Sequence, residues 1–375
     1  MAVRIIESDD RRGRGRFIDV PWGIYPGRYP HWVPPLRIER RDFLDPRKNP
    51  FFEHAEVKLF LAEDERGRAC GRIAGIINHN HNAIYHDQTG FFGLFECVDD
   101  ADVAAGLFRA AAGFLRARGM TVMRGPMNLC VNDDIGLLVD GFDLPPMIMM
   151  PYNPPYYENL VAGFGFQPVM NLLAHYSETP TGEPPPNLER GARLAQQRHR
   201  FRLRKLNMRD FDGEVQRIKT VYDAAWAENW GAVAMTDKEF RHLAKDLKMI
   251  VDPDLCFIAE VEGRVAGFSL SLPDLNQALI HLNGRLLPFG ILRLLWYKRR
   301  INAVRIITMG VLKEYRHMGI DACFYCETYR NAHAKGMPRG EASWILENNT
   351  PMNRALEKMG FRVYKTYRLY DLPLT

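Results

Sequence analysis

Apolar residues recur in the same order in both halves of the chain, as three short runs followed by one longer run with helical spacing. Runs of alternating or continuous apolar residues predict strands, and a run in which apolar residues return every three to four positions predicts a helix. In the N-terminal half the predicted strands are 60–63, 71–77 and 91–97, followed by a helix over 102–118. In the C-terminal half they are 257–261, 267–272 and 305–312, followed by a helix over 319–335.

The two halves are also similar residue by residue. FLAEDERGRACG at 60–71 matches FIAEVEGRVAG at 257–267, with an offset of 197 at its start (257 − 60) and 196 at its end (267 − 71). NPP at 153–155 matches NTP at 349–351, again at an offset of 196 (349 − 153). Because one offset is kept over about 100 residues, the sequence predicts an internal duplication.

Each half therefore predicts an antiparallel meander followed by strand, helix and strand. This order is typical of an α/β (α+β) fold, a mixed and mostly antiparallel sheet flanked by helices. The predicted organisation is a domain over 1–180, a Pro-rich and then basic linker over 181–198, and a second domain over 199–375. The halves differ by two insertions, a loop at 128–146 and an apolar, basic stretch at 286–300.

Composition narrows the class of protein further. The 375 residues are 46% hydrophobic and 25% charged, and the longest apolar runs fall short of the ~20 residues that cross a bilayer. We therefore expect a folded protein without integral membrane association. The N-terminus has no secretory pattern and the chain has six cysteines, so we expect a cytoplasmic protein with reduced thiols.

Charge is distributed unevenly between the halves. Residues 1–180 hold 19 Lys and Arg against 23 Asp and Glu, a net −4, whereas residues 181–375 hold 31 against 22, a net +9. The charge of the C-terminal half therefore favours binding of a polyanion more than that of the N-terminal half does. The basic stretch 190–205 has few interleaved aromatic residues, so we expect no nucleic-acid partner.

One segment of the C-terminal half has the composition of an anion cradle. GVLKEYRHMGID at 310–321 ends a predicted strand and begins a predicted helix, with Gly319 at the start of the helix. Free backbone N–H groups at a helix N-terminus, together with the helix dipole, bind phosphate groups. An ordinary glycine at a helix start, beside a surface arginine, is the alternative interpretation.

This segment and the residues after it resemble the GNAT superfamily of acyl-CoA-dependent N-acyltransferases. The family pattern V-x-P-x-Y/F-R/Q-x-x-G-x-G/A matches at Val311, Tyr315, Arg316 and Gly319, and the later pattern N-x₆-Y-E-x-x-G-F matches at Asn349 and from Glu357 to Phe361. The resemblance covers residues 200–375 and extends through the repeat to a degenerate N-terminal copy. It implies tandem GNAT-like domains and acetyl-CoA or another acyl-CoA as the co-substrate.

Residue roles come from the resemblance, position by position. It implies a pyrophosphate cradle, a strand edge that binds the pantetheine arm, and an asparagine, Asn349, beside the cofactor. The residues implied for the cofactor are Met309, Val311, Leu312, Arg316, Met318, Gly319, Ile320 and Asp321. Two positions depart from the family: Asp321 replaces Gly or Ala, and Leu356 replaces the tyrosine that protonates the departing thiolate.

The N-terminal copy lacks the cradle. Aspartates, Asp99 and Asp102, stand where the C-terminal copy has Arg316 and Gly319. Carboxylates cap a helix well but repel phosphate. We therefore predict one cofactor site, in the C-terminal half, and a scaffolding or pocket-forming role for the N-terminal half.

Direct transfer to an amine needs a base and a way to stabilise the thiolate. The ionisable candidates near the predicted cleft are Glu341, Glu347, His281, His317, Tyr325 and Tyr367. Glu347 has the best position, at the end of a central strand beside Asn349, and these two are the predicted catalytic residues; a solvated strand end or a helix-cap carboxylate is the alternative for Glu347. No metal is expected, since a polar hairpin is favoured for His79, His81 and His86 and core packing for Cys323 and Cys326.

The two insertions carry the remaining candidates. Asn128, Asn132 and Asp133 would bind an amine or amino-acid-like acceptor, although a loop held together by its own Asx turns fits equally well. For 286–300, a packed helix is favoured over a lid, an acyl-chain wall or a membrane-surface helix.

The sequence thus predicts an acyl-CoA-dependent N-acyltransferase, most simply an N-acetyltransferase, that acts on a small-molecule amine. The alternatives are a long-chain N-acyltransferase that uses acyl-CoA or an acyl carrier protein, and a non-catalytic acyl-CoA-binding protein. Acceptor, acyl length, donor and oligomeric state are left open by the sequence.

Overall fold

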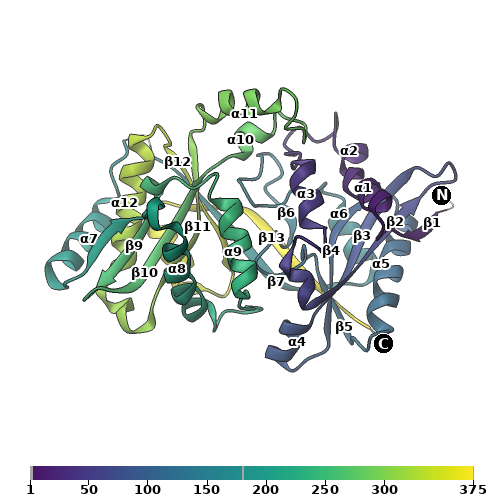
Figure 1. The fold of residues 1–375 in the computed structure, drawn as a ribbon, viewed down its shortest axis with the longest axis horizontal. Coiled ribbons are helices and arrows are strands. Elements are labelled where there is room, and N and C mark those ends of the chain that lie inside the picture. Colours follow the sequence, from purple (N-terminus) through teal and green to yellow (C-terminus); the bar gives the residue numbers. More distant parts are fainter. Residues whose placement is uncertain (1–2, 180, 375) are drawn as a thin grey trace. The chain divides into compact units, whose positions relative to one another are not determined.

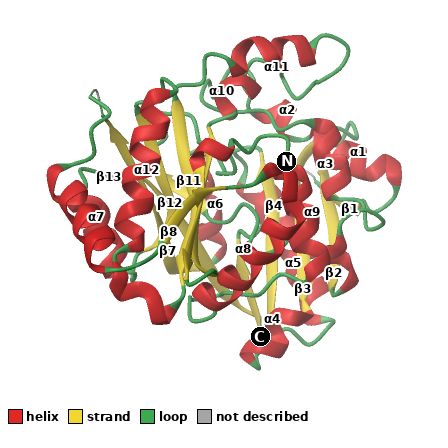
Figure 2. Ribbon diagram, turned by 60° about the vertical axis from the view of Figure 1, so that its left-hand side comes forward, coloured by secondary structure: helices red, strands yellow, loops and turns green. Residues whose placement is uncertain are grey.

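The computed structural model describes residues 3–179 and 181–374, which form two compact units. Unit 1 contains the chain up to Leu172, Ala278–Leu295 and the chain from Lys365 onward. Unit 2 contains Leu173–Gln277 and Trp296–Tyr364. Each unit is a sheet with helices packed on it, so the predicted mixed α/β fold is confirmed (Figures 1 and 2).

The sheet of unit 1 is mostly antiparallel. Its strands are β1 (Arg4–Glu7), β2 (Ala55–Glu63), β3 (Ala69–Asn78), β4 (Thr89–Cys97), β5 (Val122–Gly125) and β6 (Leu137–Asp140). The strands β1 to β4 pair in antiparallel order, and β4 pairs with β5 in parallel. The C-terminal part of β13 (Arg362–Pro373) completes this sheet, since Tyr370 pairs with Gly125 and Tyr367 with Leu138.

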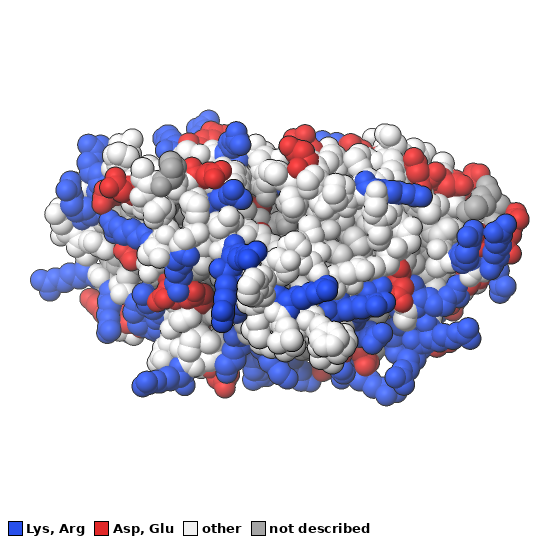
Figure 3. All heavy atoms as spheres, turned by 90° about the horizontal axis from the view of Figure 1, so that it is seen from above, with Lys and Arg blue, Asp and Glu red and all other residues white. Residues whose placement is uncertain are grey.

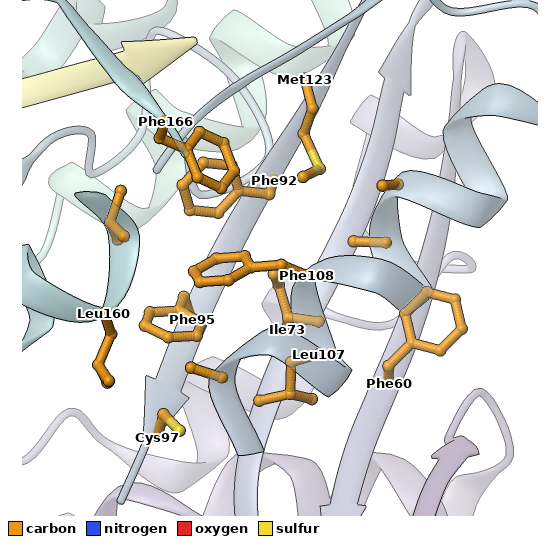
Figure 4. Close-up of a cluster of buried hydrophobic side chains, with 14 of the residues drawn as sticks. Phe60, Ile73, Phe92, Phe95, Cys97, Leu107, Phe108, Met123, Leu160 and Phe166 are labelled. Atoms are coloured by element: carbon orange, nitrogen blue, oxygen red, sulfur yellow. The ribbon is translucent and has the colours of Figure 1, made fainter. Parts of the chain in front are cut away.

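Helices cover the sheet of unit 1 and enclose its core. They are α1 (Arg11–Asp19), α2 (Pro21–Ile24), α3 (Arg37–Phe43), α4 (His79–Tyr85), α5 (Ala101–Arg116), α6 (Tyr157–Phe164) and α10 (Asn276–Leu279), with a 3-10 turn η1 (Pro50–Glu53). Figure 4 shows the core between α5 and the strands, where Phe92, Phe95 and Phe166 surround Phe108. Burial of these rings removes apolar area from water and so stabilises this unit.

Unit 2 repeats the arrangement. Its strands are β8 (Arg202–Lys205), β9 (Cys256–Val261), β10 (Arg264–Pro273), β11 (Ala303–Val311) and β12 (Arg339–Leu346), with the second half of β7 (Gln167–Glu178). Its helices are α7 (Pro186–Arg198), α8 (Phe211–Trp226), α9 (Asp237–Leu247), α12 (Ile320–Ala334) and α13 (Thr350–Lys358), with 3-10 turns η2 (Met208–Asp210), η3 (Pro253–Leu255) and η4 (Lys313–Met318). A further helix, α11 (Gly290–Lys298), ends the segment that joins the two units.

Strand alternation in β9 explains why helices cover both faces of this sheet. Cys256 and Ile258 pack with α8 and α9, whereas Phe257 and Ala259 pack with α12. Residues two apart on a strand share a face, so the continuous apolar run of β9 serves two cores. Such a continuous run is present in the sequence at 257–261.

The predicted strands and helices are confirmed by the structure. Gly119 and Gly336 end the two long helices in the left-handed region, at φ 79° and 75°, where glycine is favoured. The buried Cys323 and Cys326 thiols pack against Ala192 and Ala195, as expected for core residues. Burial raises the pKa of Cys323 to about 12 and that of Cys326 to about 11.

One local expectation is wrong, and another segment is more ordered than its composition indicates. Residues 79–85 form helix α4 rather than a hairpin, because Asn78 Oδ1 accepts a hydrogen bond from the His81 backbone N–H and caps the helix. The stretch predicted as a linker contains helix α7, whose Ala192 and Ala195 pack against α12. The limits of the two predicted domains stay a prediction.

Candidate acyl-CoA site in unit 2

Strands β11 and β12 separate where the sequence predicts the cofactor arm. They pair in parallel from Ala303–Arg339 to Ile306–Ala342. Beyond this last pair β11 continues to Val311 and β12 to Leu346. Two strands that diverge in this way free backbone N–H and C=O groups on their facing edges, which a ligand amide can then bind.

The helix after β11 begins with a glycine at the predicted position. Gly319 is the N-cap of α12 at φ 71°, and no side chain among the described residues caps this end. The N–H groups of the first turn are therefore available to an anion, and the helix dipole favours one there. Arg316, in the turn η4, is exposed and its Nε donates to the Val311 carbonyl oxygen at 3.2 Å.

The structure brings most of the predicted cofactor residues together. Met309, Val311, Met318 and Ile320 belong to one apolar cluster with Phe324. Their side chains are used in packing, so contacts to a cofactor would come from the backbone. Leu312, by contrast, packs on the opposite face with α8 and α9, and its N–H donates to Ala266 O at 2.9 Å.

The equivalent positions in unit 1 are filled by the chain itself. Asp100 caps α5 by accepting hydrogen bonds from the N–H groups of Asp102 and Val103. Beside the diverging part of β4, Asn128 Oδ1 accepts from Leu94 N at 2.7 Å, and Met127 N donates to Phe92 O at 2.8 Å. A ligand would have to displace these bonds, which agrees with a cofactor site in the C-terminal half alone.

An apolar core cluster lies beside the divergence of β11 and β12. It includes Met309, Tyr325, Ile345, Met352 and Leu356. The Tyr325 hydroxyl donates to the Met352 sulfur at 3.3 Å, across from α12 to α13. Burial, and then the charge of Asp321, raises the pKa of Tyr325 above the ordinary tyrosine value, so this phenol keeps its proton at neutral pH.

Tyr325 was a weak candidate from the sequence. In the structure, however, Tyr325 lies close to the position of the missing family tyrosine. Leu356 occupies that position and is fully buried in the same cluster as Tyr325. The signal that could have found Tyr325 is its place on α12, one turn after the cradle and facing inward. A hydrophobic substitution on α13 is thus accompanied by a phenol on the neighbouring helix.

Glu347 and Asn349 lie between β12 and α13. Asn349 caps α13, its Oδ1 accepting from Met352 N at 3.3 Å, and the Asn353 amide donates to the Glu347 carbonyl oxygen at 3.2 Å. Glu347 is exposed. Neither residue is excluded from catalysis by these bonds, and their predicted roles remain predictions.

A buried carboxylate, Glu341, belongs to a network that fixes β11 to β12. Glu341 faces Arg305 across the two strands, with Oε1 3.5 Å from Arg305 Nε, and both side chains are almost completely buried. Ser343 and Tyr364 donate hydrogen bonds to the two Glu341 oxygens. A buried pair satisfied in this way holds the strands in register at the point before they diverge.

The predicted acceptor loop is held together by its own residues. Asp133 Oδ2 accepts from Cys130 N at 3.3 Å, and Asn128 is occupied by Leu94, so the Asx-rich interpretation describes this loop. Burial, moderated by the Cys130 thiol, raises the pKa of Asp133 to about 7. Asn132 is half-buried in the same loop. Binding of an acceptor by these three residues stays a prediction.

Among residues 3–179 and 181–374, no group of three or more His, Cys, Asp or Glu side chains is close enough to hold a metal ion. His81 is buried against Tyr85 and Phe91.

The two units, each a mostly antiparallel sheet with helices packed on it, define a tandem GNAT fold. A solved tandem GNAT protein from the clavulanic acid biosynthesis pathway has this fold, with a TM-score of 0.56 at 12% identity over 100% of this chain and 99% of its own. A probable N-acyltransferase from Enterococcus faecalis V583 has a TM-score of 0.51 at 8% identity, over 100% of this chain and 73% of its own. No protein-family model matches the chain.

Two relatives are similar to the chain along nearly its whole sequence. The chain is 39% identical over 366 residues to "Bacterial ceramide synthase" of Caulobacter vibrioides (strain NA1000 / CB15N), covering 96% of this chain and 94% of that protein. It is 36% identical over 361 residues to "Protein YghO" of Escherichia coli (strain K12), covering 95% and 91%. The chain therefore belongs to the family that contains these two proteins, and it has the fold of a tandem GNAT protein.

Proposed function

We propose that this protein is a long-chain N-acyltransferase that moves a fatty acyl group from acyl-CoA to the primary amine of a sphingoid base. The observation that carries this proposal is the 39% identity to the ceramide synthase, which runs through nearly the full length of both chains. A ceramide is a sphingoid base acylated on its nitrogen, so the reaction is the amide-forming step that GNAT folds support.

Acetyl transfer, the simplest expectation from the resemblance, is the less favoured form of this function. The substrate of an enzyme that makes ceramide is a fatty acyl thioester. The partly buried side chains beside the diverging strands, Met309, Ile345 and Met352, are apolar, an environment that suits a pantetheine arm and the start of an acyl chain.

In the proposed reaction the neutral amine attacks the thioester carbonyl carbon. The C–N bond forms, the C–S bond breaks, and CoA leaves as a thiolate that takes up one proton while the nitrogen releases one. Tyr325, protonated and one turn into α12, is the proposed proton donor to the thiolate. The first-turn N–H groups after Gly319, with Arg316, hold the pyrophosphate.

The base that accepts the ammonium proton remains among the predicted carboxylates. Glu347 lies at the exposed end of β12, in the unit that holds the cradle. The pH profile of kcat/KM for Glu347→Gln, compared with that of the wild type, tests this role.

The experiment that tests the function combines two thioesters with one acceptor. Purified protein is incubated with sphinganine and either palmitoyl-CoA or acetyl-CoA, and both free CoA and the N-acyl product are measured by mass spectrometry. We expect product with palmitoyl-CoA at a rate well above that with acetyl-CoA. Thioester binding without release of CoA in the presence of amine would instead identify a non-catalytic acyl-CoA-binding protein.

A further inference from the structure

The insertion of the C-terminal half is fixed at its base. Asn283 and Gly284 form a left-handed turn at φ 49° and 72°. Trp22 Nε1 donates to Asn283 Oδ1 at 2.8 Å, and the Arg37 N–H donates to the Gly284 carbonyl oxygen at 3.0 Å. The Arg37 guanidinium also lies 3.6 Å above the Trp22 ring. These contacts hold the N-terminal end of the insertion in a defined place.

The residues beyond this anchor expose large apolar side chains. Exposure is 72% for Leu287, 70% for Phe289, 63% for Leu292, 56% for Leu295 and 59% for Trp296. In α11, which the structure describes throughout, no residue is buried, so the packed helix favoured by the sequence is wrong. A contiguous apolar surface that a folded chain leaves in water marks an interaction site.

The exposed residues share one side of the helix. Gly290, Leu294 and Tyr297, spaced by four and three, are the less exposed positions. Leu292, Leu295 and Trp296 lie on the opposite, outer side, and Phe289 precedes Leu292 by three residues. The outer side is therefore a stripe of bulky apolar groups with an aromatic residue near each end.

The charge around this stripe has one sign. Between Asp274 and Glu314 the chain has no acidic residue, whereas Arg285, Arg293, Lys298, Arg299 and Arg300 surround the stripe. Figure 3 looks onto the side where α11 lies at the top of Figure 1, and it shows uncharged surface with Lys and Arg side chains beside it. Arg300 lies 5.0 Å from the Trp296 ring.

We propose that α11 docks this protein onto an anionic lipid bilayer. Leu292, Leu295 and Trp296 enter the boundary between headgroups and acyl chains, while Lys298, Arg299 and Arg300 bind anionic headgroups. With nine residues, α11 is far shorter than the ~20 that cross a bilayer, so it lies in the interface. No helix in the described part of the chain is long and apolar enough to span a membrane.

Charge favours a bilayer over a second copy of the chain. In a symmetric dimer the same patch faces itself, and five cationic side chains from each copy would be apposed without an acidic partner in the segment. An anionic bilayer instead supplies both an apolar layer and the opposite charge. This docking goes beyond acyl transfer, although it would bring the enzyme to lipid substrates.

Flotation with lipid vesicles tests the docking. Full-length protein is mixed with vesicles of phosphatidylglycerol and phosphatidylcholine in equal parts, and with vesicles of phosphatidylcholine alone. We expect binding to the anionic vesicles that weakens with salt, and about tenfold or more weaker binding by Leu292→Asp/Leu295→Asp. Met249→Asp is the matched control, because Met249 is 78% exposed on another surface. A second pair, Arg299→Glu/Arg300→Glu, is compared with Arg241→Glu/Lys245→Glu on α9.

Quenching of tryptophan by brominated acyl chains locates the contact. We expect quenching of the wild-type protein that is lost in Trp296→Phe, which keeps the apolar contact and therefore still floats with the vesicles. Persistent quenching in Trp296→Phe, equal binding by the Asp variants and the wild type, or a concentration-dependent dimer abolished by those variants would each overturn the proposal. Because the vesicles contain neither a thioester nor a primary amine, this result is independent of the proposed acyl transfer.

Discussion

Trp22 and Asn283 lie 261 residues apart in the sequence, and the indole Nε1 donates a 2.8 Å hydrogen bond to the Asn283 side-chain oxygen. The bond joins the N-terminal helices to the base of an insertion found only in the C-terminal half. The next residue, Gly284, has its Cα against the same indole. A Cβ there would come within 2.4 Å of Trp22 and 2.7 Å of the Pro35 carbonyl oxygen.

Gly284→Ala should therefore loosen the anchor. The substitution forces a left-handed φ on alanine, which costs about 1 kcal/mol, and adds a clash worth about 1–3 kcal/mol. Gly27→Ala is the control, since Gly27 has φ 77° but open space around it. We expect hydrogen exchange over 278–295 to accelerate in Gly284→Ala alone. Equal exchange in the two variants would mean that the Trp22 contact does not hold the insertion.

The cradle predicts a charge-specific loss of CoA binding. Gly319 and Gly336 flank α12 in the same left-handed conformation, at φ 71° and 75°. Aspartate tolerates this conformation, so Gly319→Asp and Gly336→Asp carry similar backbone strain. We expect titration calorimetry with CoA to show at least about tenfold weaker binding for Gly319→Asp and little change for Gly336→Asp.

A neutral variant separates charge from shape at the same position. A Cβ on Gly319 would lie 2.9 Å from the Ala195 Cβ, so any side chain disturbs α7 slightly. Gly319→Asn has nearly the same shape as Gly319→Asp without the charge. Equal losses for the two would show that packing, and not phosphate binding, depends on Gly319.

Tyr325 and Tyr329 provide the matched pair for the proton donor. Both lie on α12 one turn apart, and the Tyr329 hydroxyl donates to the Met359 carbonyl oxygen at 3.3 Å. We expect Tyr325→Phe to lower kcat by about a hundredfold or more, with CoA binding kept. Tyr329→Phe should cost about 1 kcal/mol of stability and leave kcat nearly unchanged. Undiminished turnover in Tyr325→Phe would assign thiolate protonation to another group or to water.

The repeat explains how much of this fold could be predicted. Local patterns such as the Gly263 turn and the Gly336 cap depend on a few adjacent residues, so the elements of both halves could be predicted from their own sequence. The pairing of Tyr370 with Gly125 could not, because a terminal strand has the same alternating pattern whichever sheet edge receives it. Partner choice is decided by tertiary packing.

In the candidate site, too, the local features could be predicted from the sequence and the tertiary contacts could not. The cradle at Gly319 is indicated by a strand, a glycine and a helix in direct succession. The Tyr325–Met352 contact joins two helices separated by a strand, and the sequence offers only an inward position on α12 as a sign of it. Leu292 and Trp296 are exposed, whereas leucine and tryptophan are usually buried. Their basic neighbours were the signal in the sequence that could have indicated this exposure.

The raised pKa of Asp133 predicts that the stability of the folded protein depends on pH. Its pKa is about 7 in the folded protein against an ordinary value of 3.8, so the folded state binds the proton more tightly than the unfolded state. The folded state should therefore lose stability as the pH rises from about 4 to 7. We expect a loss on the order of 1 kcal/mol or more, a figure that allows for solvent screening of a side chain that is only partly buried.

Replacing the Asp133 carboxylate by an amide tests this sign. Asp133→Asn keeps an oxygen to accept from Cys130 and removes the charge. We expect urea unfolding to show that this variant gains stability over the wild type at pH 8 and has no advantage at pH 4. Asp140→Asn, which changes an exposed carboxylate on β6, is the control. If Asp133→Asn were equally stable relative to the wild type at both pH values, the proton affinity assigned to Asp133 would be wrong.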